Sequence, residues 1–199
     1  MDAQTPDLTK IFKACIFAAN KHKDHIRKDE QGSPYVTHPL QVAQVIWQIG
    51  GITNTNILVA AILHDTIEDT KTRDAEIIES FGNTVLEIVR EVSDDKSLEK
   101  SERKRLQVLH APDKTYPARI IKWGDKLVNC CDILNSPPKD WTLERRRNYI
   151  QWAADVLFII RGTNPALEAA FDKMLTEAEI QLDYSIQPFE TIHLRPWAP

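Results

Sequence analysis

The sequence predicts an all-α protein, and three observations support this. Apolar residues recur with helical spacing along most of the chain. Glycine is scarce, with six residues in 199, and no useful length of chain alternates polar and β-branched residues as a half-buried strand does. A chain of this length with 42% hydrophobic residues can bury one sizeable core. We therefore expect a single helical bundle.

Recognisable breaks divide the first half of the chain into helices. A polar turn containing Gly32 and Pro34 ends the first segment, and the Gly-Gly pair at 50–51 ends the second. Pro39 suits the first turn of the second helix, and Asn54 or Thr55 can cap the third. These signals predict helices at about 7–24, 37–49, 72–81 and 83–92, and a buried helix that begins near 55 and includes 57–63.

The second half begins with a charge-dense run at 94–105, which is typical of a solvated helix face. Two prolines predict a loop at 111–118. We expect helices at about 118–134, 142–161 and 165–184. The last segment holds three prolines and no period, so we expect it to lie on the surface or be disordered. The predicted domain thus spans 1–185, and the tail spans 186–199.

Composition limits the classes of partner. The net charge of −4 argues against a general nucleic-acid binder, and no apolar run is long enough to span a bilayer. Cys15, Cys130 and Cys131 contain no C-x-x-C spacing, so we expect reduced thiols in a cytoplasmic protein. The sequence leaves the oligomeric state open.

One helix end carries four ionisable groups. Residues 57–63 are apolar on every side of a helix, which predicts a buried helix. His64 and Asp65 follow, and Glu68 and Asp69 lie one turn further on if the helix continues. Such groups are costly to bury unless a cation or hydrogen bonds compensate them. The alternative interpretation is structural, with Asp65 capping a neighbouring helix and His64 hydrogen-bonded in the core.

Four buried polar residues form a candidate metal site: His38, His64, Asp65 and Asp125. Each lies in or beside an apolar helix, and a helical bundle could bring them to one point. Two histidines and two carboxylates suit manganese, iron or zinc better than calcium. The set leaves positions for water, which a hydrolytic metal requires.

These residues match the H…HD…D pattern of the HD-domain phosphohydrolase superfamily. The flanking segments resemble the hydrolase domain of the RelA/SpoT homologues, and especially the stand-alone small alarmone hydrolases, including the metazoan type. The resemblance rests on 27–39 (RKDEQGSPYVTHP), 63–70 (LHDTIEDT), 99–108 (EKSERKRLQV) and 122–129 (KWGDKLVN), and it covers about 8–180.

The resemblance implies an HD-domain helical bundle that holds one manganese ion per chain and binds a small nucleotide. It implies removal of the 3′-pyrophosphate of guanosine tetra- and pentaphosphate. The implied metal ligands are His38, His64, Asp65 and Asp125, and Glu68 with Asp69 would orient and deprotonate the attacking water. Arg27 would stack on the base, and further substrate contacts would come from Lys28, Tyr35, Asn129 and Tyr149, with Lys100 and Arg145 as phosphate-side cations.

The sequence departs from the family pattern beside Asp125. Trp123-Gly124 and Val128 stand where the family has Leu-Ala and Tyr or His, so we expect altered packing behind the site. Two other functions remain open: an HD phosphohydrolase of another nucleotide, such as NADPH, and a non-catalytic alarmone-binding module. The intact acid pair argues against the second.

Two groups of cationic or titratable residues have a structural rather than a functional interpretation. His22 and His25 have a spacing that could bind metal, but we expect them at a solvated helix end. The run 145–147 can be a solvated face, with one of its three arginines pointing inward.

Overall fold

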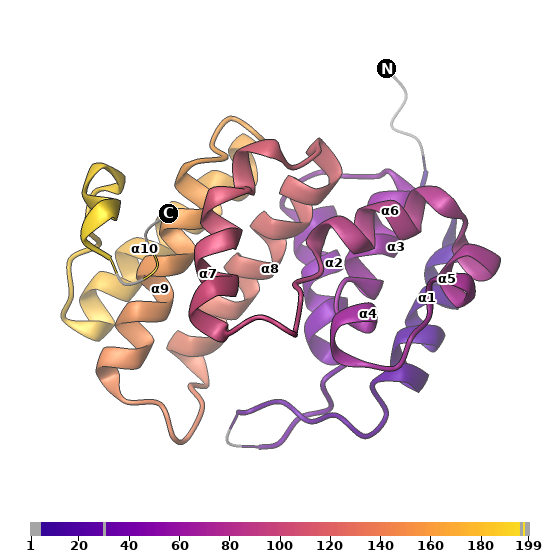
Figure 1. Cartoon of the computed structure of the whole chain (residues 1–199), viewed down its shortest axis with the longest axis horizontal. Helices are drawn as coiled ribbons and strands as arrows, with labels where there is room; N and C mark the ends of the chain where they lie inside the picture. Colours follow the sequence, from indigo (N-terminus) through magenta and orange to yellow (C-terminus); the bar gives the residue numbers. More distant parts are fainter. Residues whose placement is uncertain (1–4, 30, 196, 198–199) are drawn as a thin grey trace.

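The computed structural model describes residues 5–29, 31–195 and 197. In this part of the chain it contains helices, one isolated β-bridge between Ile26 and Pro34, and no strand, which confirms the predicted all-α class. The α-helices are α1 (Leu8–Lys21), α2 (Thr37–Gln48), α3 (Thr55–Leu63), α4 (Thr66–Asp69), α5 (Asp74–Phe81), α6 (Asn83–Val92), α7 (Lys100–Leu109), α8 (Tyr116–Asn135), α9 (Leu143–Phe158) and α10 (Pro165–Leu182). Figure 1 shows α8 between the group α1–α6 and the group α7, α9 and α10.

The apolar helix α3 is enclosed by its neighbours, as its sequence predicts. The Asn54 side-chain oxygen caps it by accepting hydrogen bonds from the backbone N–H groups of Asn56 (2.9 Å) and Ile57 (3.2 Å). Every residue from 57 to 63 is buried, and α1, α2, α6 and α8 all contact the helix. The end of α3 therefore opens into the interior of the bundle.

The helix does not continue as far as the acid pair, so the condition under which Glu68 and Asp69 would lie one turn beyond His64 and Asp65 on the same helix is not met. The chain turns at residues 64–65, and α4 begins at Thr66. The Thr66 hydroxyl donates to the Leu63 carbonyl over 2.6 Å, a local bond that competes with helix continuation. The Asp69 N–H still donates to the Asp65 carbonyl over 2.8 Å. The turn separates the two groups of ionisable residues.

A close contact between α2 and α8 accounts for one departure from the family pattern. A Cβ atom at Gly124 would lie 2.7 Å from Cγ1 and 2.9 Å from Cδ1 of Ile46, so the side chain of Ile46 occupies that space. Trp123 is fully buried and meets Phe171 of α10 edge-on, with ring centroids 5.7 Å apart. Trp123 therefore fills the side of α8 that faces α10, and Gly124 leaves room for Ile46 on the side that faces α2.

Several predicted boundaries shift. The predicted loop at 111–118 contains the 3₁₀ helix η1 (Ala111–Asp113) and the start of α8, whose first turn accommodates Pro117 because the first N–H groups of a helix lack helical acceptors. The helix predicted from Thr72 begins at Asp74, and the charged run is irregular until α7 begins at Lys100.

The C-terminal segment differs from the prediction of a surface or disordered tail. Residues Phe189–Leu194 form the 3₁₀ helix η2, and Trp197 is buried. The carboxylate of Asp155 in α9 is 0% exposed; Arg195 Nε lies 2.6 Å from it, and Trp197 Nε1 donates to it over 2.9 Å. A buried carboxylate needs such partners, and the tail supplies them. Pro196 and residues 198–199 lie outside the described part.

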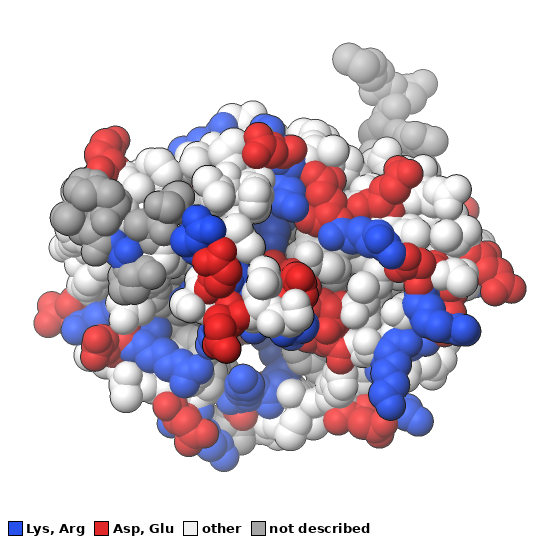
Figure 2. Space-filling model, in the orientation of Figure 1, with Lys and Arg blue, Asp and Glu red and all other residues white. Residues whose placement is uncertain are grey.

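The surface seen in Figure 2 mixes both signs of charge, and basic side chains also lie in the hollow between α6 and α7. Within the described residues, no helix has the length and apolar character needed to cross a membrane.

Substitution of Gly124 tests the α2–α8 contact. We expect Gly124→Ala to lower the free energy of unfolding by about 1–3 kcal/mol, because the new methyl group overlaps Ile46. Urea denaturation measures this. The loss should be smaller in an Ile46→Val background, where Cδ1 is absent; purely additive effects would contradict this account of the contact.

Candidate active site

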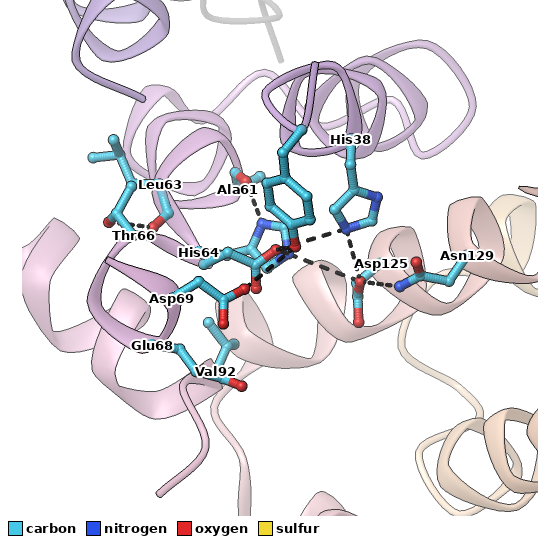
Figure 3. A network of polar contacts seen from close by, with 12 residues as sticks. His38, Ala61, Leu63, His64, Thr66, Glu68, Asp69, Val92, Asp125 and Asn129 are labelled. Carbon is cyan, nitrogen blue, oxygen red and sulfur yellow. Dashed lines mark hydrogen bonds and ion pairs between the residues drawn. The ribbon is translucent and has the colours of Figure 1, made fainter. Parts of the chain in front are cut away.

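Four side chains from separate elements converge at the end of α3. His38 comes from the first turn of α2, His64 and Asp65 from the turn after α3, and Asp125 from the middle of α8. His38 Nε2 lies 3.2 Å from Asp125 Oδ1 and 3.8 Å from Asp65 Oδ2. His64 Nε2 lies 3.1 Å from Asp65 Oδ2 and 3.8 Å from Asp125 Oδ1. Figure 3 shows His38, His64 and Asp125 pointing toward one another.

Three members of this cluster, His38, His64 and Asp65, place ligand atoms within 4.8 Å of one another, as a divalent metal requires, and Asp125 faces the same two histidines. Ligand atoms at ~2.1 Å from one ion lie roughly 3.0–3.5 Å apart when they are neighbours in its coordination shell. His64 Nδ1–H donates to the Ala61 carbonyl over 2.8 Å, which leaves the lone pair on Nε2 facing the two carboxylates. That Nε2 is buried and accepts no well-oriented hydrogen bond, so its lone pair is available to a metal ion.

The electrostatics of the cluster also call for a cation. Burial raises the pKa of Asp65 and Asp125, but the cationic groups nearby outweigh burial and hold both pKa values below the ordinary value. Burial lowers the pKa of His64, yet the same two carboxylates raise it to about 9. The carboxylates thus attract a positive charge, which a proton or a metal ion can supply.

Three neighbours hold the carboxylates in place. Asn129 donates to Asp125 Oδ1 over 2.6 Å, Lys126 donates to Asp125 Oδ2 over 2.9 Å, and the Tyr35 hydroxyl donates to Asp65 Oδ2 over 2.5 Å. Asn129 and Tyr35 were predicted as substrate contacts, and in this structure they donate hydrogen bonds to the carboxylates of the candidate metal ligands Asp125 and Asp65. Sequence reasoning missed Lys126, although its position next to Asp125 in an apolar helix was a usable signal.

Glu68 and Asp69 line the same pocket as His64, Asp65 and Asp125, a polar cavity of about 180 Å³ that we call the metal pocket. The Glu68 carboxylate accepts a hydrogen bond from the backbone N–H of residue 94 over 2.9 Å. Burial, the largest effect, raises its pKa. The ammonium of Lys96 pairs with both carboxylates, at 3.2 Å from Glu68 and 2.6 Å from Asp69.

A second cavity of about 270 Å³, which we call the nucleoside pocket, joins the metal pocket at Tyr35 and Asn129. The predicted substrate contacts Arg27, Lys28 and Tyr149 line it, and so does Trp141, which sequence reasoning did not single out. The guanidinium of Arg27 pairs with Asp132 and donates to Gln41 Oε1 over 3.0 Å, so neighbouring polar groups fix its position.

The predicted phosphate-side cations gather near this pocket. Burial lowers the pKa of Lys100, and the charges of Arg145 and Lys28 lower it further, as is expected when cations crowd one region. The Arg145 guanidinium lies over the Trp141 ring, 4.4 Å from its centroid. Of the three consecutive arginines, Arg147 points inward and donates to the Leu182 carbonyl over 2.5 and 2.8 Å.

The prediction for His22 is wrong. It is 2% exposed, its Nδ1 lies 3.1 Å from Nδ1 of His25, and its ring centroid lies 4.9 Å from that of Tyr35. His22 therefore packs behind the tyrosine that holds Asp65, a tertiary contact that helix periodicity cannot reveal.

Comparison with known proteins identifies the family of the chain. Residues 14–115 match the HD domain family model, and the chain belongs to this family. It is 47% identical to the guanosine-3′,5′-bis(diphosphate) 3′-pyrophosphohydrolase MESH1 of Xenopus tropicalis, over 87% of this chain and 97% of that protein. The human protein of the same name is 42% identical over 86% of this chain and 96% of its own length.

A solved structure is similar over most of the chain. It is described as a metazoan ortholog of SpoT that hydrolyses ppGpp, and it superposes with a TM-score of 0.84 at 41% identity, covering 87% of this chain and 97% of its own. The HD-domain fold predicted from the sequence is confirmed.

Thermal denaturation tests the metal cluster without any assay of turnover. A divalent ion at about 100 times its Kd should stabilise the protein by about 2.7 kcal/mol, or roughly 5–10 °C in Tm for a chain of this size. We expect manganese to raise the Tm of the wild type and of an Asp172→Asn control, whose carboxylate pairs with Arg161 elsewhere. Asp125→Asn and His64→Ala should lose the shift, and an unchanged shift in both would exclude this site.

Proposed function

We propose that this protein hydrolyses the 3′-pyrophosphate of guanosine 3′,5′-bis(diphosphate) and of the corresponding pentaphosphate, giving GDP or GTP and pyrophosphate. One observation carries the proposal: a two-histidine, two-aspartate cluster and an acid pair share a pocket that opens into a cationic, aromatic cavity. The activity for which the relatives are named supports this substrate class. In this proposal residues 1–185 form the catalytic unit, and 186–199 form a tail.

The proposed metal is manganese, one ion per chain, held by His38, His64, Asp65 and Asp125. Mixed nitrogen and oxygen donors support manganese over calcium. When bound there, the ion neutralises phosphate charge and makes water more acidic. Lys126, Asn129 and Tyr35 donate hydrogen bonds to the two aspartate carboxylates. These donors favour the charged form of each carboxylate, which is the form that binds a metal.

The acid pair handles the proton in this mechanism. Glu68 accepts a proton from the attacking water, and its raised pKa makes it a better base than an exposed carboxylate. Asp69 orients that water through its second oxygen. The water oxygen forms a bond to phosphorus, and the bond from phosphorus to the 3′ oxygen breaks. The 3′ oxygen takes up one proton as it leaves, which balances the proton that Glu68 took from the water and loses again before the next turnover.

The nucleoside pocket binds the rest of the substrate. Arg27 presents a planar guanidinium to the purine, and Trp141 with Tyr149 supplies an aromatic wall. Lys28, Lys100 and Arg145 would face the 5′ phosphates. A small nucleotide is the only partner that this proposal requires.

We further propose a cytoplasmic location. The thiols of Cys15, Cys130 and Cys131 are free. Free thiols support a reducing environment, because cysteines in oxidising compartments often form disulfides.

Amide variants separate the acid pair from the metal ligands. We expect Glu68→Gln and Asp69→Asn to retain one metal ion and to lower kcat by roughly 10²–10⁴, because an amide cannot accept the proton. Turnover of guanosine tetraphosphate and of NADPH, measured side by side, together with elemental analysis tests this. Loss of the metal from either variant would make that residue a ligand, and a much larger kcat/KM for NADPH would reassign the substrate.

The raised pKa of Glu68 predicts the acid side of the pH profile. A base must be deprotonated, so activity falls as the pH drops through its pKa, and burial moves that loss above 4.5, the ordinary value for a glutamate. Plotting kcat/KM against pH should therefore give an acid limb above pH 4.5. The limb should be absent in the residual activity of Glu68→Gln, whereas an identical limb in that variant would assign the base elsewhere.

A further inference from the structure

The metal pocket has a second neighbour besides the nucleoside pocket. A cavity of about 160 Å³, lined by residues of α7 and of the chain after α6, shares Asp94, Gln107 and Lys122 with the metal pocket. Figure 2 shows basic side chains in the hollow between α6 and α7. The metal pocket therefore connects the nucleoside pocket to a region that carries buried positive charge.

Lys122 is the unusual residue of this region. It lies on α8, one turn before Asp125, and is 7% exposed. Its ammonium makes one long hydrogen bond, to the Val92 carbonyl at 3.4 Å, and no carboxylate in the described part of the chain lies within 4.0 Å of it. The nearby Asp94 carboxylate accepts a hydrogen bond from Gln107 Nε2 over 2.7 Å. An ammonium has three donors, so at least two have no protein acceptor among the residues that the structure describes.

Two other lysines of the region have compensation that Lys122 lacks. Lys126 pairs with Asp125 at 2.9 Å. Lys104 lies over the rings of Trp152 and Trp197, at 4.7 and 5.2 Å from their centroids. Burial is the largest cause that lowers the pKa of both Lys104 and Lys122 to about 8. A buried ammonium without a counter-charge is costly, and an anionic ligand would remove that cost.

The chemistry of the reaction names the anion. Attack at the phosphorus next to the 3′ oxygen releases both phosphates of the group together, so the distal phosphate must also be held. The nucleoside side of the metal pocket carries Arg27 and Lys28, and the other side carries Lys122. A cation on that side stabilises the distal phosphate before and after the bond breaks.

We propose that Lys122 forms a pyrophosphate subsite, in which its ammonium binds the distal phosphate of the 3′ group and then the free inorganic pyrophosphate. The subsite rests on the proposed function for its place in the reaction. Its ligand class, a diphosphate anion, follows from the unpaired ammonium in a polar cavity beside the candidate metal ligands.

Calorimetric titration of the manganese-loaded protein with inorganic pyrophosphate tests the subsite without turnover. We expect Lys122→Met to raise the Kd for pyrophosphate by roughly tenfold or more, as is usual for loss of a charged hydrogen bond. Lys122→Arg should retain most of the affinity because it keeps the charge. The matched control is Lys104→Met, because Lys104 is half-buried, has a pKa that is also lowered to about 8, and lies outside this pocket. This variant should change the Kd for pyrophosphate less than about twofold. Elemental analysis after titration verifies that the metal stays bound.

Amine acylation of the wild-type protein provides a second measurement that needs no variant to fold. Mass spectrometry should show that pyrophosphate protects Lys122 from acylation and leaves Lys104 unprotected, whereas GDP protects neither. Equal labelling of Lys122 with and without pyrophosphate, or wild-type affinity in Lys122→Met, would overturn the subsite. Pyrophosphate binding through Lys122 in a protein that does not cleave guanosine tetraphosphate would refute the proposed function alone, and cleavage without that binding would refute the subsite alone.

Discussion

The rest of the structure depends on the concentration of charge at the end of α3. An apolar helix, buried along residues 57–63, delivers His64 and Asp65 into the interior, where Asp125 adds a second carboxylate. Two mostly buried carboxylates this close together are stable only beside positive charge and hydrogen-bond donors. The surrounding elements supply the donors through Tyr35, Lys126 and Asn129. A divalent ion can supply the remaining positive charge that the two carboxylates require.

The packing of α8 on α2 sets the width of this site. Gly124 permits Ile46 to fill the space beside α8, and the next residue is Asp125, whose Oδ1 lies 3.2 Å from His38 Nε2. A bulkier residue at 124 would push apart the two helices that carry these ligands. The family departure at Trp123-Gly124 is therefore compensated within the core, and Val128 lines a surface groove rather than the nucleoside pocket.

The sequence predicted the parts of the molecule that depend on local patterns. Helix order, the Asn54 cap and the buried character of α3 follow from periodicity and capping signals. The spacing of polar residues in apolar helices also selected the residues that the structure brings together. Long-range partners were not predictable in this way: Trp197 reaches Asp155 from 42 positions away, and the isolation of Lys122 is visible only once its neighbours are placed.

The central claim is that this charged helix end holds a metal that directs cleavage at the 3′ ester bond. Phosphorus NMR of the products formed from guanosine tetraphosphate, with manganese exchanged for diamagnetic magnesium or removed by chelation before the spectrum, tests it most directly. The account predicts GDP and one equivalent of intact pyrophosphate, with no product when the protein is stripped of metal. Two equivalents of orthophosphate, loss of the 5′ phosphates, or full turnover by the stripped protein would contradict it.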